Sequence, residues 1–131
     1  MLSYRDTDSV YLACGATDMR KSIDGLAAIV QLGFDLDPFS SSWFVFCNRG
    51  RDRLKILRRD HNGFWLYYRR LERGRFAWPT AATEQSTRLE SSPQGVPGTR
   101  LVSRRQLTWL LDGLTLEQRK AHPEVDVHAV A

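Results

Sequence analysis

Residues 53–71 read RLKILRRDHNGFWLYYRRL, in which two stretches rich in strand-forming residues flank the sequence DHNG at 60–63. An Asn-Gly pair between two such stretches is the strongest short-range signal for a β-hairpin. The sequence therefore predicts a hairpin with strands at 53–59 and 64–71. Its register stays open, because moving the turn by one residue changes every cross-strand pair.

The hairpin and its flanks carry the positive excess of the chain. The segment from Arg49 to Arg75 holds ten Lys or Arg and three acidic residues, a net charge of +7 in a chain whose total is +4. Such a confined excess predicts contact with backbone phosphates, whereas the alternative is a solvated sheet face over a packed core. The ten cations are Arg49, Arg51, Arg53, Lys55, Arg58, Arg59, Arg69, Arg70, Arg73 and Arg75.

Aromatic residues are interleaved with these cations. Trp65 and Tyr67 are predicted to stack on bases or sugars, as aromatic side chains do in proteins that bind single-stranded nucleic acid. Arg20 and Lys21 would extend the phosphate-binding patch if their loop lies beside the hairpin. In the alternative, Asp18 caps the following helix and both cations face solvent. Both faces of the hairpin carry cations and aromatics, so the sequence does not assign a single basic face.

Apolar periodicity predicts the elements on either side of the hairpin. Residues 10–14 (VYLAC) and 43–47 (WFVFC) are apolar runs typical of buried strands. Apolar residues recur at helical spacing over 23–30, and again over 107–114 after a capping-box sequence, SRRQ, at 103–106. We therefore expect one amphipathic helix before the central strand and one near the C-terminus.

This order of strand, helix, three strands and helix predicts a small α+β domain. We expect a small antiparallel sheet of about four strands, which includes the basic hairpin and is packed by one or two amphipathic helices. The domain should span residues 1–114. Residues 80–100 are poor in apolar residues and contain several Ser, Pro and Gly, which predicts a mobile loop. Residues 115–131 lack periodicity and predict a poorly ordered C-terminal tail.

The composition argues against several classes of protein. No run of about 18 apolar residues exists, so we expect no membrane partner, no secretory leader and a cytoplasmic location. Cys14 and Cys47 lie far apart without a CxxC pattern, and the histidines lack ligand spacing, so neither a metal nor a cofactor is expected. A nuclease would need carboxylates that converge on a divalent metal, and here they are scattered beside cations or at turns, so no catalytic residue is assigned. These carboxylates are Asp18, Asp24, Asp52, Asp60 and Glu72.

Four phrases of the sequence occur together in one known family. They are TDMRK at 17–21, IDGL at 23–26, DRLKIL at 52–57 and RLERGRFAWP at 70–79. In this order and spacing they closely resemble the TnpB accessory proteins, the products of the second open reading frame of bacterial insertion-sequence-66-type transposable elements. The resemblance covers residues 10–79 and resumes over 101–113. It implies participation in DNA transposition beside a separate, larger transposase that holds the catalytic residues, and it implies no known enzymatic activity.

The charge pattern and the resemblance together predict a non-catalytic accessory protein for DNA transposition. Its basic hairpin would bind the DNA backbone at or near the element ends and assist the transposase. The alternative is a protein–protein adaptor that docks on an acidic surface of the transposase without direct DNA binding. A third, weaker hypothesis is a metal-dependent nuclease. Trp109 lies off the line of leucines on the second helix and is predicted to contact the transposase or another protein of the same element.

Overall fold

The computed structural model describes residues 8–80 and 98–116. Within this part of the chain, five strands and two helical regions follow one another in the predicted order, with one strand more than expected. The elements are β1 (Val10–Ala13), α1 (Ile23–Ala28), the π-helical η1 (Ile29–Gly33) that continues α1, β2 (Trp43–Cys47), β3 (Arg53–Asp60), β4 (Gly63–Arg70), β5 (Thr99–Val102) and α3 (Arg104–Leu111).

The strands form one sheet in the order β4-β3-β2-β1-β5. This arrangement confirms the α+β class, but the sheet is mixed rather than purely antiparallel, because β1 and β2 are parallel and the other pairs are antiparallel. The parallel pair is possible because α1 and η1 lie between β1 and β2 in the chain and return it to the starting edge. Periodicity identifies strands, but it does not show which of them pair.

The fifth strand, β5, lies where a loop was expected. The expectation of a loop over 80–100 is wrong at its C-terminal end, because Thr99 and Arg100 belong to β5. This strand pairs with β1 over four residues, from Thr99 opposite Ala13 to Val102 opposite Val10. A strand of four residues carries too little periodicity to be recognised locally. The rest of the expected loop, 81–97, lies outside the described residues.

The packed part of the chain also extends past the expected domain end at 114. Leu116 is buried in the core beside α3, and its carbonyl oxygen accepts a hydrogen bond from Gln106 Nε2 at 3.4 Å. Thr115 and Leu116 are the described residues of the expected tail, and 117–131 lie outside the described part.

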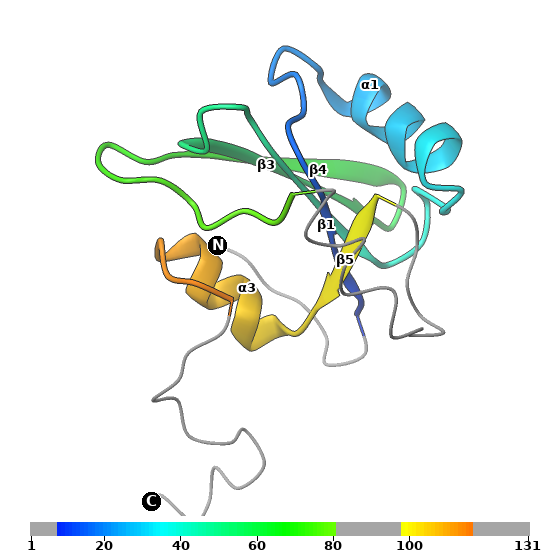
Figure 1. The fold of residues 1–131 in the computed structure, drawn as a ribbon. Coiled ribbons are helices and arrows are strands. Elements are labelled where there is room, and N and C mark those ends of the chain that lie inside the picture. The colour runs from blue at the N-terminus through cyan, green and yellow to red at the C-terminus, as the bar shows by residue number, and fades with distance from the viewer. Residues whose placement is uncertain (1–7, 81–97, 117–131) are drawn as a thin grey trace, which may run out of the picture.

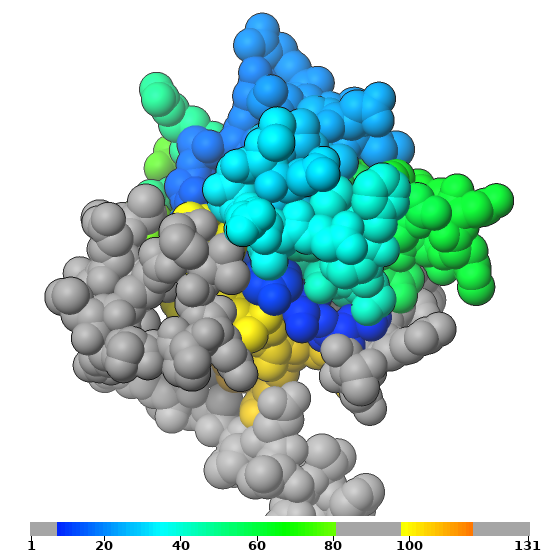
Figure 2. Space-filling model, turned by 90° about the vertical axis from the view of Figure 1, so that its right-hand side faces the viewer, coloured from blue at the N-terminus to red at the C-terminus, as the bar shows by residue number. Residues whose placement is uncertain are grey.

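Side-chain alternation along the strands divides the core into two layers. One sheet face packs against α1 and η1 through Phe44, Phe46 and Leu57, and the other packs against α3 through Val45 and Ile56. Because successive residues of a strand point to opposite faces, the two helices cover opposite sides of the sheet, as Figure 1 shows. We call these sides the α1 face and the α3 face. In Figure 2, α1 and η1 (light blue to cyan) lie near the middle of the view, and the hairpin (green) extends beyond them to one side.

The hairpin register follows from its turn. Asp60 pairs with Gly63, so His61 and Asn62 are the two turn residues. The turn therefore lies one residue earlier than an Asn62-Gly63 turn, and His61 takes a left-handed φ of 52°. Leu57 packs on the α1 face, so the odd-numbered residues of β3 and their even-numbered partners on β4 face the same way.

The two helices begin differently. At α3, the backbone N of Gln106 donates to Ser103 Oγ at 3.1 Å and the backbone N of Ser103 donates to Gln106 Oε1 at 2.9 Å, which confirms the predicted capping box. Ser22 precedes α1 and makes no side-chain cap. The loop before α1 is therefore held by other contacts. No helix in the described ranges is long and apolar enough to span a membrane.

Candidate nucleic-acid interface

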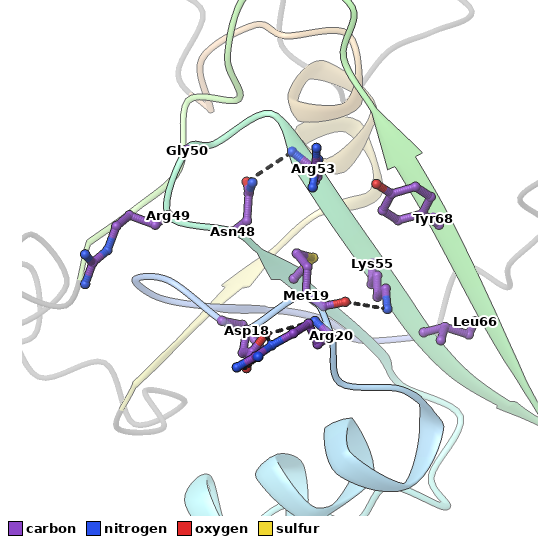
Figure 3. A pocket seen from close by; sticks show the side chains of 11 residues that line it. Asp18, Met19, Arg20, Asn48, Arg49, Gly50, Arg53, Lys55, Leu66 and Tyr68 are labelled. Atoms are coloured by element: carbon purple, nitrogen blue, oxygen red, sulfur yellow. Dashed lines mark hydrogen bonds and ion pairs between the residues drawn. The ribbon is translucent and has the colours of Figure 1, made fainter.

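A groove of about 730 Å³ lies on the α1 face of the hairpin. Its walls come from three parts of the chain: the loop at 17–20, the turn between β2 and β3 at 48–50, and the strands β3 and β4. Figure 3 shows how side chains from these segments surround it. The cations of the wall are Arg20, Arg49, Arg53 and Lys55, and Asp18 is the single carboxylate among the described residues that line the groove.

Lys55 on β3 holds the loop at 17–20, the first wall of the groove, against the sheet. Its Nζ donates to the backbone oxygens of Met19 and Lys21, both at 2.8 Å. Both acceptors belong to the loop before α1, where the helix has no side-chain cap. An ammonium group has three N–H donors, and Lys55 uses two of them in these hydrogen bonds. Lys55 is therefore a positioning residue, and it places Arg20 beside the hairpin.

Asp18 orients Arg20 at the rim of the groove. Its Oδ1 accepts hydrogen bonds from the Arg20 backbone N at 2.9 Å and Nε at 3.1 Å, and its Oδ2 accepts one from Nη2 at 2.9 Å. The side-chain hydrogen bonds from Arg20 are the main reason that the pKa of Asp18 falls to about 2. The Arg20 side chain is 91% exposed, so its outer N–H groups face solvent. Asp18 thus orients a guanidinium group instead of capping α1.

Asn48 builds the second wall. Its Oδ1 accepts hydrogen bonds from the backbone N of Asp52 and of Arg53, both at 3.1 Å, and its Nδ2 donates to Asp52 Oδ1 at 2.8 Å. This side-chain hydrogen bond is the main cause of the lowered pKa of Asp52. The closed turn places Arg49 at its tip and Arg53 at the start of β3, and both side chains are exposed.

The groove gathers part of the predicted cation set. Arg20, Arg49, Arg53 and Lys55 line it, and Arg70 pairs with Arg53 in the hairpin register, which places Arg70 on the same face. The five other exposed members of the set do not line the groove; they are Lys21, Arg51, Arg69, Arg73 and Arg75.

Arg58 belongs to the core of the α3 face. Its side chain is 14% exposed, its guanidinium carbon lies 4.6 Å from the ring centroid of Trp43, and its Nη2 donates to Asp8 Oδ2 at 3.3 Å. The Asp8 side chain is 2% exposed and also accepts a hydrogen bond from Trp43 Nε1 at 3.3 Å. Arg58 Nε is buried without a hydrogen-bond partner among the described residues. The groups that surround Arg58 leave it little surface for a phosphate.

Arg59 supports the hairpin turn. Its Nε donates to the backbone oxygen of His61 at 2.9 Å. Its guanidinium carbon lies 5.1 Å from the ring centroid of Phe39 and 5.3 Å from that of Phe64. Arg59 is half-buried and does not line the groove. The structure therefore separates Arg58 and Arg59 from the cations that surround the groove.

The structure places the predicted stacking residues on the opposite face. Tyr67 is half-buried on the α3 face, and its ring centroid lies 6.0 Å from that of Trp43 and 6.1 Å from that of Trp65. Trp65 is 55% exposed on that face, and its Nε1 donates to Asp60 Oδ2 at 3.1 Å. Tyr68, which the sequence pattern does not distinguish from its neighbours, is 54% exposed and lines the groove. Strand alternation gives these adjacent tyrosines different environments.

Trp109 lies on α3, away from the groove. It is half-buried, and the guanidinium carbon of Arg105 lies 4.9 Å from its ring centroid. A cation over an indole face stabilises the pair by about 0.5–1 kcal/mol at exposed sites. The contact of Trp109 with a partner protein stays a prediction.

The acidic and thiol groups that could suggest catalysis have local structural explanations at Asp52, Glu72 and Cys47. No three His, Cys, Asp or Glu side chains of the described residues lie close enough together to hold a metal ion. Asp52 is hydrogen-bonded to Asn48, and Glu72 to Arg70. Burial raises the pKa of the Cys47 thiol to about 12, so it stays protonated near neutral pH and is a poor nucleophile.

The fold and the groove define a small α+β protein with a cationic groove on one face of its β-hairpin. The chain belongs to the IS66 Orf2-like family, whose family model matches residues 8–121. The family is associated with transposition and comprises accessory proteins rather than known enzymes. This membership confirms the resemblance inferred from the four sequence phrases.

Two relatives come from Sinorhizobium fredii. The chain is 37% identical over 105 residues to uncharacterized protein y4hO, a match that covers 80% of this chain and 79% of that protein. It is 33% identical over 70 residues to uncharacterized protein y4jC, a match that covers 53% of this chain and 60% of that protein. No solved structure matches the chain.

Proposed function

We propose that this protein is a non-catalytic accessory factor of transposition that binds the DNA backbone through its groove and assists a separate transposase. The observation that carries the proposal is that the described residues lining one groove include four cations and a single carboxylate. Membership of the IS66 Orf2-like family associates the protein with transposition. Contact with DNA is the part that we add.

The groove offers the groups that phosphates bind. Arg49 and Arg53 are exposed, and Arg20 keeps N–H groups directed to solvent after it pairs with Asp18. A guanidinium group presents its donors in a planar fork that matches phosphate oxygens, and Arg70 adds another on the same face. Phosphate contacts position a protein on DNA but carry no sequence information. We therefore expect element-end and scrambled sequences to bind alike, with the transposase supplying the choice of site.

The test is DNA binding across a salt series, measured by fluorescence anisotropy with the purified protein. If cations displace counterions from phosphates, the logarithm of affinity falls linearly with the logarithm of salt concentration, with a slope of about −0.9 per neutralised duplex phosphate. Changing Arg20, Arg49 and Arg53 together to Ala should make this slope shallower by about 2.7, if each contacts one phosphate.

A charge-matched variant controls for net charge. Arg69, Arg73 and Arg75 are exposed and do not line the groove, so changing these three to Ala removes the same charge from elsewhere. We expect this control to keep the slope of the wild type. Equal slopes for the two triple variants would contradict the proposed surface. Absence of binding at low salt would favour the alternative, an adaptor whose basic hairpin docks on an acidic surface of the transposase.

A further inference from the structure

Tyr68 brings an aromatic ring into the cationic groove. This residue is 54% exposed and lines the groove together with Leu66. It pairs with Lys55 across the hairpin, and Lys55 Nζ lies 6.0 Å from its ring centroid. Arg20 and Arg49 line the same groove. An exposed ring among exposed guanidinium groups suits a ligand that carries planar rings along a chain of negative charges.

A nucleic acid strand has this chemistry, and the ring distinguishes its two forms. Stacking on an aromatic side chain requires a base with a free face. In a duplex, neighbouring base pairs cover the faces, and the grooves present only the edges of the bases. A duplex can therefore use the arginines of this groove without Tyr68, whereas an unpaired strand can use both.

We infer that the groove takes single-stranded DNA, with one base stacked on Tyr68 and the neighbouring phosphates held by Arg20, Arg49 and Arg53. This inference rests on the proposed function and adds the form of DNA that is preferred. Single-strand binders combine a basic path for the backbone with aromatic side chains for the bases, and they tolerate many sequences because every base has a π-face.

Hydrogen bonds within the protein hold both walls of the groove in place. Lys55 holds the loop that carries Arg20, through hydrogen bonds to two backbone oxygens. Asn48 closes the turn that carries Arg49, through hydrogen bonds to two backbone N–H groups. Binding of a strand therefore does not have to order these segments, which lowers the entropic cost of association.

The test compares two fluorescent ligands of equal length, an oligothymidylate strand and a mixed-sequence duplex, at the same salt concentration. They are titrated with the wild type and with Tyr68→Ala, Tyr68→Phe and Trp65→Ala. Trp65 is the matched control, because it is 55% exposed on the same strand but belongs to the α3 face. Tyr68→Phe keeps the ring and should keep the affinity.

We expect Tyr68→Ala to weaken single-strand binding at least about fivefold, the lower end of the loss of one base stack, and to leave duplex binding unchanged. Trp65→Ala should leave both unchanged. A strand that carries 5-iododeoxyuridine should cross-link to Tyr68 on irradiation, which gives a readout that does not depend on affinity.

The other outcomes would overturn either the inference or the proposed function. Equal losses on both ligands, or no loss on the single strand, would overturn the inference and leave the proposed function in place. A third titration uses a fluorescent oligouridylate of the same length, and binding of this strand at least as tightly as oligothymidylate would also overturn the inference, in favour of RNA. Absence of binding to both DNA forms would overturn the proposed function itself.

Discussion

Replacing Arg58 by Met should destabilise the fold without weakening DNA binding. The change removes a guanidinium group that lies over the ring of Trp43 and 3.3 Å from the Asp8 carboxylate. The Asp8 side chain is 2% exposed. Removal of one partner of a buried ion pair costs about 3–5 kcal/mol. Because the Arg58 side chain is 14% exposed and its Nε has no hydrogen-bond partner among the described residues, we expect a loss of about 3 kcal/mol. This is a large share of the roughly 5–15 kcal/mol that stabilise a typical domain.

Urea unfolding followed by far-UV circular dichroism measures this loss. With a slope of about 1.5 kcal/mol per molar urea, a loss of about 3 kcal/mol lowers the midpoint by about 2 M. The matched variant is Arg53→Met, which changes an exposed arginine of the same strand on the groove side. It should change the free energy of unfolding by no more than about 0.5 kcal/mol, and it should make the salt slope of duplex binding shallower by about 0.9. The reasoning is refuted if Arg58→Met leaves the midpoint unchanged and alters the salt slope instead.

Burial raises the pKa of the Cys47 thiol to about 12. In a Cys14→Ser background, this thiol should therefore react with Ellman's reagent only after the protein is denatured. Fast reaction in the folded protein would contradict the buried position of Cys47. Hydrogen bonds from Arg20 lower the pKa of Asp18 from 3.8 to about 2, so its stabilising contribution is complete above pH 3.8 and is lost as the pH falls through about 2. Carboxyl NMR should give a titration midpoint near 2 for Asp18, which moves toward 3.8 in Arg20→Ala; a wild-type midpoint already at 3.8 would rule out the pairing in solution. Ser103→Ala removes the side-chain cap of α3 and should lower the free energy of unfolding in urea by about 1 kcal/mol. Ser103→Asp should retain most of this stability, because an Asp side chain can also cap a helix. Equal losses in the two variants would show that the cap contributes little.

Elements defined by contacts between near neighbours were predictable from the sequence. The sequence at 60–63 predicted the hairpin, and the pattern at 103–106 predicted the start of α3. The fifth strand was missed because its hydrogen bonds go to β1, at the other end of the chain. The parallel pairing of β1 with β2 was missed for a related reason, since an apolar run contains no information about the direction of its neighbour.

The candidate site was predictable as a segment but not as a surface. The density of positive charge pointed to residues 49–75, and the structure places several of these cations around one groove. The sequence did not distinguish Arg58 from Arg53, because Asp8 and Trp43, the partners of Arg58, lie far from it along the chain. It did not select Tyr68 over Tyr67 either, because both sides of the hairpin are partly apolar.

The position of β1 between β2 and β5 determines the order in which the sheet can be completed. The hairpin of β3 and β4 closes over a two-residue turn and can form as soon as it leaves the ribosome. The pairing of Val10 with Val102 spans most of the chain, and such distant pairings form slowly. Until β5 is made, one edge of β1 stays open to pairing with other chains. Among the described strands, the first to be synthesised is therefore the last to gain both neighbours, and a copy of the gene truncated before β5 would lack the strand that covers this edge of β1.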